Sequence, residues 1–383
     1  MTTDDGPPAS LAISAPARLH FGLIPRGASH SRSFGGAGLM VDGPGLTLDA
    51  SARPAPKWAT TGPLAPRALE VARHLVESLR IEGINPDPLA ITIDRAPTEH
   101  AGLGTGTTLS LAVARLILAS LGEVDPSASR LAALTGRGRR SGIGLHGSSL
   151  GGLLVDGGRS PRSMFPPLLA RFPFPPNWSI LVVFPDRRSG LAGPAELDAF
   201  ASLPELSPDA ADHLGSLLLL EILPAVAEAD FLPFTRALTT YQEAIGRAFS
   251  PAQGGLFSHP DLAHLAAKLR SIGIRAVGQS SWGPTLYGFY EMKDSGRADI
   301  LDRLPGQVSR DTTFIWAEPS EHGSSFITRG LSREKIVRSP IFDHQGEESV
   351  DRGESRDQAE GGASPDQASS HSLTSRSLQR NEG

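Results

Sequence analysis

The sequence predicts an α+β protein of two domains. Segments that alternate like strands are interspersed with apolar runs of helical length. The 383 residues are enough for two domains of about 100–200 residues each. Between an expected strand at 89–94 and an expected helix at 109–121 lies a glycine-rich loop, residues 97–108. This strand–loop–helix unit is the centre of the functional analysis.

The remaining elements follow from the spacing of apolar residues and from helix-ending glycines and prolines. Strands are expected at 12–21, 39–42, 151–156, 179–184, 275–279, 286–289 and 312–316, and helices at 67–80, 126–135, 209–227, 234–249 and 261–272. A proline-rich connection at 161–176 suggests the domain boundary. We therefore expect domains at 11–170 and 171–335, a disordered N-terminus at 1–10 and a disordered tail at 338–383, where apolar residues become too few to offset ordering entropy.

The loop at 97–108 has the residue types that bind phosphate. Glycine allows sharp turns and close approach of the backbone to a ligand, and a helix start offers amide groups to an anion. Threonine hydroxyls can contact phosphate oxygens or Mg²⁺. The candidate phosphate-binding residues are Gly102, Leu103, Gly104, Thr105, Gly106, Thr107 and Thr108, with Thr107 as the candidate Mg²⁺ ligand. The spacing fits neither a Walker loop, which needs a lysine, nor a dinucleotide fingerprint.

Four further stretches contribute candidates. Each has a plainer structural interpretation that stays open here: a core histidine, a hairpin turn, a solvated basic turn, or arginines that pair with Asp42 or Asp156. The candidates are Arg18 and His20 on the first strand, Arg32, Gly35 and Gly36 in a bend, Arg140, Ser141, Gly142 and His146 in a glycine- and arginine-rich turn, and Ser280 and Ser281 in a late glycine-serine loop.

Composition excludes several classes of function. A net charge of −5 gives no reason to expect nucleic acid, so an anion site must be local. The chain has no cysteine, which removes disulfides, thiolate zinc sites and cysteine nucleophiles. We expect no membrane span, because no apolar run reaches about 18 residues, and no signal peptide, so we expect a cytoplasmic protein. Lysine occurs only at Lys57, Lys268, Lys293 and Lys335, so arginine must hold phosphates.

Three of these stretches together resemble the GHMP kinase superfamily. Residues 15–23, 97–108 and 278–288 correspond in order to its N-terminal strand, its central Gly-Leu-Gly loop and its C-terminal glycine-rich loop. Within the superfamily, the chain is most similar to the β-ribofuranosylaminobenzene 5′-phosphate synthase family, through residues 18–23, 32–38, 102–107 and 140–144. The resemblance covers roughly residues 10–320.

The resemblance implies a fold and a reaction. The fold is a ribosomal S5 domain 2-like N-terminal domain with a ferredoxin-like C-terminal domain, in a homodimer. The reaction joins phosphoribosyl pyrophosphate to 4-aminobenzoate with loss of CO₂ and pyrophosphate, assisted by Mg²⁺, in tetrahydromethanopterin biosynthesis. Arg18, Arg32 and Arg140 are then the candidate catalytic residues that hold the two anionic substrates.

One departure separates the chain from the kinases of the superfamily. Several of them keep a catalytic Asp in a Ser-Gly-x-Asp segment, where it activates the acceptor hydroxyl. The matching segment, Ser141 to Gly144, ends in glycine. The synthase reaction deprotonates no hydroxyl, so this favours the synthase. An ATP-dependent GHMP kinase that relies on positioning and a non-catalytic metabolite-binding protein of the same fold are the alternatives.

Overall fold

The structure is a computed structural model that describes residues 10–25, 31–51, 53–185, 190–191, 193–291, 297–304, 312–329 and 334–337. All of them belong to one compact unit. The expected N-terminal segment overlaps this part of the chain only at Ser10, and the tail at 338–383 lies outside it. The domain boundary near residue 170 stays a prediction.

The strands of the described residues form a mixed sheet, in which β12, β11, β1, β2, β10, β7, β9 and β8 are neighbours in that order. Further strands attach along β2, which pairs with both β4 and β5. The bounds are β1 Ser10–Ile24, β2 Gly35–Ser51, β3 Ala59–Thr61, β4 Ala90–Arg95, β5 Leu153–Asp156, β6 Leu168–Phe172, β7 Trp178–Phe184, β8 Arg275–Gln279, β9 Leu286–Glu291, β10 Thr313–Pro319, β11 Ser325–Arg329 and β12 Glu334–Val337.

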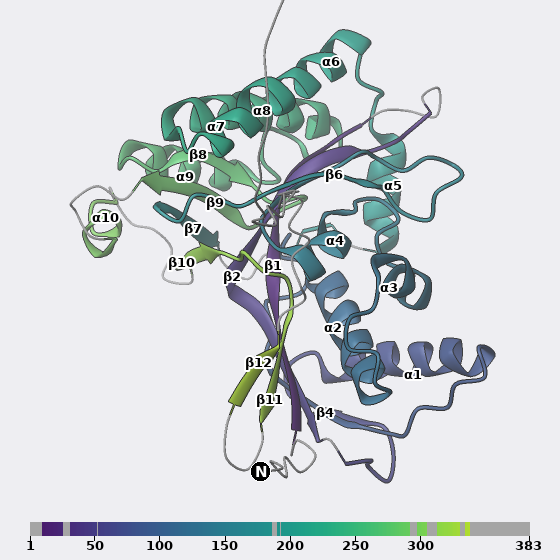
Figure 1. Ribbon diagram of the computed structural model, residues 1–383. Helices are drawn as coiled ribbons and strands as arrows, with labels where there is room; N and C mark the ends of the chain where they lie inside the picture. Colours follow the sequence, from purple (N-terminus) through teal and green to yellow (C-terminus); the bar gives the residue numbers. More distant parts are fainter. Residues whose placement is uncertain are drawn as a thin grey trace, which may run out of the picture. The chain divides into compact units, whose positions relative to one another are not determined.

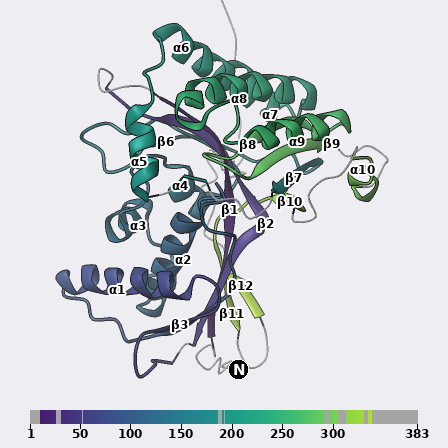
Figure 2. The same ribbon diagram turned by 180° about the vertical axis from the view of Figure 1, so that it is seen from behind.

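The helices group in two places around this sheet. In Figures 1 and 2, α1 to α5 lie to one side of the long strands β1 and β2, and α6 to α9 lie together with β8 and β9 near one end of them. Their bounds are α1 Ala65–Ile81, α2 Thr105–Ser120, α3 Ala128–Thr135, α4 Ile143–Leu150, α5 Gly193–Ser202, α6 Pro208–Ser216, a π-helical turn Leu217–Ile222, α7 Leu223–Ala227, α8 Phe231–Gln253, α9 Pro260–Ser271 and α10 Ala298–Leu301.

Strand β2 positions the candidate site, because different parts of its length pair with different strands. Its first residues pair with β5 and its last with β4. Since β4 leads into the glycine-rich loop and β5 follows the arginine-rich turn, both turns are anchored to one strand. Strand β1, which carries Arg18 and His20, pairs with β2 along nearly its whole length.

The expected elements are present, and several more were not expected. The proline-rich connection contains β6, which is paired to β5. The glycine-rich turn runs directly into α4 at Ile143, where the small residues of Ile143–Leu150 pack against β1 and β2. Helix α5 and strand β11 were also missed. Short segments such as these are stabilised by tertiary packing rather than by their own periodicity.

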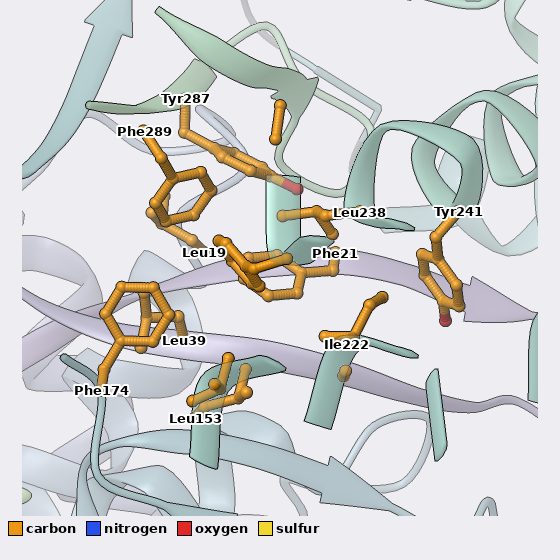
Figure 3. Packing of buried hydrophobic residues seen from close by; sticks show 14 of the residues in the cluster. Leu19, Phe21, Leu39, Leu153, Phe174, Ile222, Leu238, Tyr241, Tyr287 and Phe289 are labelled. Atoms are coloured by element: carbon orange, nitrogen blue, oxygen red, sulfur yellow. The ribbon is translucent and has the colours of Figure 1, made fainter. Parts of the chain in front are cut away.

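An aromatic cluster forms the core between β1, β9 and α8. Trp178 stacks on Phe234 with ring centroids 4.9 Å apart, and Phe21 lies 5.4 Å from Tyr287. Figure 3 shows Phe21, Tyr287 and Phe289 of this cluster, with Leu238 of α8 beside Phe21. A second apolar cluster packs α1 and α2 against β2 and β4. The two cores hold both ends of the β1–β2 pair.

One helical run, Pro208–Ala227, is long and apolar enough to cross a membrane by length and composition alone. Several of its apolar residues, including Leu214 and Ile222, are buried in the aromatic core, whereas Leu219 and Leu220 are exposed. The sequence analysis expected no apolar run of this length, but this helical run reaches it by length and composition.

Arg115 is a buried arginine on α2, the helix whose apolar residues belong to the second apolar cluster. Its side chain is fully buried, and its Nη2 donates to the Ser149 hydroxyl at 2.5 Å. The Nε and Nη1 atoms have no hydrogen-bond partner within the described residues. Burial lowers the pKa of Arg115, opposed by the charge of Asp125. The charged side chain therefore costs stability where it lies.

We expect Arg115→Met to raise the free energy of unfolding by about 1–3 kcal/mol, because an apolar chain of similar length avoids the desolvation penalty. Urea denaturation of both proteins measures this difference. Ser149→Ala is the matched control and should lower stability, since it removes the described partner of the guanidinium. A less stable Arg115→Met protein would show that the buried charge is compensated.

Candidate active site

The glycine-rich loop joins β4 to α2 and has a backbone that only glycine adopts easily. Gly102 has φ 85° and Gly104, which caps α2, has φ 73°. Both values lie in the left-handed region that L side chains disfavour. The amides of Thr107 and Thr108 donate to the Gly104 carbonyl, which starts the helix. The expected strand–loop–helix unit is therefore present, with α2 beginning at Thr105.

Three motifs that are distant in sequence meet at Ser280. Its fully buried hydroxyl donates to the Gly102 carbonyl at 2.7 Å and accepts the His20 amide at 3.0 Å. The Arg18 amide donates to the Leu103 carbonyl at 3.1 Å. A Cβ atom on Gly102 would lie 2.3 Å from the Ser280 carbonyl oxygen, so the loops touch backbone to backbone. The Ser280 hydroxyl is thereby used to fix the site, and its predicted contact with substrate stays a prediction.

The Arg18 guanidinium lies over the start of α2. A Cβ atom on Gly104 would be 3.3 Å from its Nε and Cζ, and one on Gly144 would be 3.9 Å from its Cδ. The Nε atom is buried and has no hydrogen-bond partner among the described residues. Burial lowers the pKa of Arg18 to about 10, and the charges of Glu196 and Asp156 oppose the shift. Arg18 is therefore charged at neutral pH and has donor capacity beside the loop.

A hydrogen-bonded chain runs from His20 through Ser141 to Asp156. His20 Nδ1 accepts the Gly22 amide at 3.1 Å, which places the ring proton on Nε2. Nε2 lies 3.0 Å from the Ser141 hydroxyl, which in turn donates to Asp156 Oδ2 at 3.1 Å. Asp156 also accepts the amides of Gly142 and Gly158. The chain fixes the arginine-rich turn against β1 and β5.

Burial sets the ionisation of His20 and Asp156, the two titratable groups of this hydrogen-bonded series. Burial first, and the Arg18 charge second, hold the pKa of His20 well below its usual range, so the ring is neutral. Burial raises the pKa of Asp156 to about 6, although its hydrogen bonds with Gly158, Gly142 and Ser141 oppose the shift. Near neutral pH the chain is therefore a neutral imidazole, a hydroxyl and a carboxylate.

The other two candidate arginines lie at the edges of the same region. Arg32 Nη1 donates at 3.1 Å to the carbonyl of Gly158, whose amide binds Asp156. Arg140 pairs with Glu196 at 3.3 Å and lies over the Phe200 ring, 4.9 Å from its centroid. Among the described ion pairs, the partner of Arg140 is thus a residue of α5, and neither Asp42 nor Asp156.

The remaining candidates support the backbone around this chain. Cβ atoms on Gly35 and Gly36 would lie 3.3 Å and 2.4 Å from the carbonyl oxygens of Asp156 and Gly22, so both glycines permit close strand pairing. His146 lies inside, with Nε2 2.9 Å from the Pro166 carbonyl and a pKa lowered by burial. Ser281 lines a small cavity of about 60 Å³ beside His20.

Thr107, the predicted Mg²⁺ ligand, is compatible with a Mg²⁺ ion that is bound mainly by substrate phosphate. Its side chain lies near Gly144, since a Cβ atom there would be 3.3 Å from Thr107 Cγ2. The described part of the chain contains no group of three or more His, Cys, Asp or Glu that could hold a metal ion. Mg²⁺ usually keeps several waters and is bound by substrate phosphates together with only one or two protein groups. Thr107 can supply one oxygen to such a complex.

Sequence reasoning overlooked Asp156, Glu196 and Arg67 as site residues. An Asp at the end of the buried strand β5 is a signal that could have found Asp156. Glu196 lies on the unexpected helix α5. Arg67 lies on α1, and its Nη2 would be 2.7 Å from a Cβ atom on Gly106, but nothing in the sequence brings it to the loop.

The neutral state of His20 predicts a pH dependence of stability. Its folded pKa is lowered from 6.5, so the unfolded state binds more protons below that pH. Its contribution is present above pH 6.5 and is lost as pH falls. We expect His20→Asn, which keeps an acceptor for the Gly22 amide, to flatten the loss by up to about 1.4 kcal/mol per pH unit.

Urea denaturation of wild type and variant between about pH 5 and 7.5 measures this effect. Asp156 shifts in the opposite sense, because its raised pKa makes the folded state bind protons below about pH 6. It is present in both proteins, so the difference between them isolates His20. Parallel pH profiles would contradict the prediction.

Comparison with known proteins bears on this site. No protein-family model matches the chain. The chain is 29% identical over 316 residues to the β-ribofuranosylphenol 5′-phosphate synthase of Methanothermobacter thermautotrophicus, covering 78% of this chain and 94% of that enzyme. It is 28% identical over 335 residues to the Archaeoglobus fulgidus enzyme of the same name, covering 84% and 98%.

Solved structures show the same fold at low identity. Homoserine kinase from Cytophaga hutchinsonii matches with a TM-score of 0.53 and 16% identity, over 88% of this chain and 99% of the kinase. Mevalonate diphosphate decarboxylase from Staphylococcus aureus matches with a TM-score of 0.56 and 14% identity, over 86% and 98%. The resemblance seen in the sequence is thus confirmed: the chain has the α+β fold of the GHMP kinases and is similar in sequence to the β-ribofuranosylphenol 5′-phosphate synthases.

Proposed function

We propose that this protein is an enzyme that transfers a phosphoribosyl group to a 4-substituted benzoate, releasing CO₂ and pyrophosphate. The observation that carries the proposal is the placement of Arg18. Its charged guanidinium, with a buried and unpartnered Nε, lies over Gly104 at the start of α2. A positive group beside a glycine loop and a helix N-terminus suits a pyrophosphate leaving group. The chain aligns over 94% and 98% of the length of two β-ribofuranosylphenol 5′-phosphate synthases, whose name supports a ribosylated arene phosphate as the product.

The reaction breaks the bond between C1 of the ribose and the pyrophosphate oxygen. The ring carbon that bears the carboxylate then bonds to C1, and cleavage of the carbon–carboxylate bond releases CO₂ and restores aromaticity. The electron pair of that bond returns to the ring, and the pair of the broken C–O bond leaves with pyrophosphate. No acceptor hydroxyl has to be deprotonated.

The residues of the site meet these needs. Arg18 and the loop from Gly102 to Thr108 bind the leaving group, whose charge grows in the transition state. Thr107 is the residue that would hold Mg²⁺, and Mg²⁺ would neutralise part of the pyrophosphate charge. His20 adds no positive charge next to the cation-like ribose, because burial keeps its ring neutral. Arg32 and Arg140 lie at the rim and would hold the carboxylate of the benzoate.

The identity of the para substituent is the open choice. The sequence resemblance favours 4-aminobenzoate, whereas the name of the archaeal relatives contains phenol, which corresponds to a hydroxyl on the ring. By the same decarboxylating reaction, a phenol product derives from 4-hydroxybenzoate. We propose a cytoplasmic enzyme and, as the sequence resemblance implies, a homodimer.

The alternative, an ATP-dependent kinase, is disfavoured by Gly144. Glycine has no carboxylate at the position where several kinases keep a catalytic Asp, so that base is absent there. A Cβ atom at this position would lie 3.3 Å from Thr107 Cγ2, a tight contact.

The direct test is incubation with phosphoribosyl pyrophosphate, Mg²⁺ and either benzoate, each labelled with ¹³C in the carboxyl group. We expect labelled CO₂ and a ribosylated arene from at least one of them. Parallel incubation with ATP and alcohols tests the kinase. ADP formation without CO₂ release would overturn the proposal. The formation of neither CO₂ nor ADP would also overturn it.

Arg32→Lys tests whether the rim arginines bind substrate. Lysine keeps the charge but loses the two-pronged geometry, so we expect a loss of about tenfold in kcat/KM, or about 1.4 kcal/mol. Arg53→Lys, at an exposed site after β2, is the matched control and should change kcat/KM less than about twofold. A lower melting temperature with unchanged kcat/KM would assign Arg32 a structural role.

A further inference from the structure

A cleft of about 490 Å³ lies between α1, α2 and α3. Its polar lining consists of Arg67, Glu70, His74, Ser110, Thr135 and Arg137. It reaches the first turn of α2, because a Cβ atom on Gly106 would lie 2.7 Å from Arg67 Nη2. By contrast, the cavity beside His20 measures about 60 Å³. The cleft is therefore the roomier neighbour of the glycine loop.

Arg137 is positioned in this cleft without an acidic partner. Its Nε donates at 3.1 Å to the Ser110 hydroxyl, which itself donates at 2.8 Å to the Gly106 carbonyl. Burial first, and the charge of Arg67 second, lower the pKa of Arg137. In the described part of the chain no carboxylate forms an ion pair with Arg137. Arg67 and Arg137 line the same cleft, so two guanidinium groups share it.

Among the described ion pairs, Arg67 has Glu99 as its partner, through Nη1. The side chains of this pair are about one-third exposed, at 32% and 31%. Arg67 Nη2 faces the α2 turn at Gly106. Glu70 and His74 also line the cleft but are exposed to water, where their charges are screened. The protected part of the cleft therefore contains the two arginines.

Arg18 and this arginine pair lie at the same helix start. Arg18 lies against Gly104, the N-cap of α2, whereas Arg67 lies against Gly106 in the first turn. The start of α2 therefore has a positive group beside each of these two glycines. A substrate with phosphate at both ends of a ribose matches this arrangement.

We propose that the cleft between α1, α2 and α3 binds a phosphoryl group between Arg67 and Arg137. The proposal rests on the proposed function, in which phosphoribosyl pyrophosphate carries a phosphate monoester and a pyrophosphate. Two guanidinium forks suit phosphate oxygens, and the bound anion relieves the repulsion between the arginines. Glu99 competes with the anion for Arg67.

Direct binding tests this proposal without turnover. Isothermal titration of the full chain uses two probes, ribose 5-phosphate and inorganic pyrophosphate. We expect Arg67→Gln and Arg137→Gln to weaken at least one probe by about tenfold or more. Loss confined to ribose 5-phosphate assigns the monoester to the cleft, and loss confined to pyrophosphate assigns the leaving group. Wild-type affinity of both variants for both probes would overturn the proposal.

Matched variants separate binding from folding. Arg73→Gln, at an exposed position on α1, should leave both affinities within about twofold. Glu99→Gln should tighten binding severalfold, because it removes the competing carboxylate. A purely structural ion pair would instead lower the melting temperature of Glu99→Gln with no gain in affinity. Arg137→Lys, which keeps the charge, covers the case in which Arg137→Gln fails to fold and should show a smaller loss.

The outcome for the cleft is independent of the outcome for catalysis. If the wild type releases CO₂ but both arginine variants bind both probes normally, the cleft proposal fails and the synthase proposal stands. If no CO₂ is released but probe binding depends on Arg67 and Arg137, the cleft proposal stands and the synthase proposal fails.

Discussion

The site depends on one buried hydroxyl, that of Ser280. It joins the glycine loop to strand β1 by accepting the His20 amide and donating to the Gly102 carbonyl. An unmade hydrogen bond at a buried polar group costs about 1–3 kcal/mol, so separating these segments would leave several such groups unpaired. The backbone at Gly102 and Gly104 is thereby held in a conformation that brings Arg18 over α2. Rigid loops of this kind can place donors around a leaving group without reorganisation.

Burial sets the charges around this frame. His20 is kept neutral and Arg18 stays charged although both lie on β1. Burial moves the histidine pKa further below its usual 6.5 but leaves the arginine pKa at about 10, well above neutral pH. Asp156 remains the counter-charge at neutral pH, and its hydrogen bonds bind the turn that carries Ser141. The site therefore has the positive charge of Arg18 next to the glycine loop, and the negative charge of Asp156 lies at the arginine-rich turn.

The sequence allowed the fold and the glycine loop between β4 and α2 to be predicted, because strand–glycine–helix order is a local pattern. It also indicated Arg18, whose neighbours are strand residues with clear alternation. It could not reveal that Arg67 meets Gly106 or that Glu196 meets Arg140, since these contacts depend on how α1 and α5 pack. Helix α5 contains no buried residue, so its sequence has no apolar stripe to detect. Likewise, the sequence could not show that the Ser280 hydroxyl bonds to the backbone at His20 and Gly102, because these partners are brought together by the tertiary fold.

Glycine at position 144 connects the fold to the chemistry. In several GHMP kinases, which the chain resembles in fold, the corresponding side chain takes a proton from the acceptor, but here Thr107 and Arg18 lie next to this glycine. A carboxylate at this point would place a negative charge next to Arg18 and, in the proposed reaction, weaken its attraction for pyrophosphate. The absence of the carboxylate and the presence of the arginine therefore act in the same direction. For the reaction proposed here, both favour departure of an anionic leaving group over activation of a hydroxyl nucleophile.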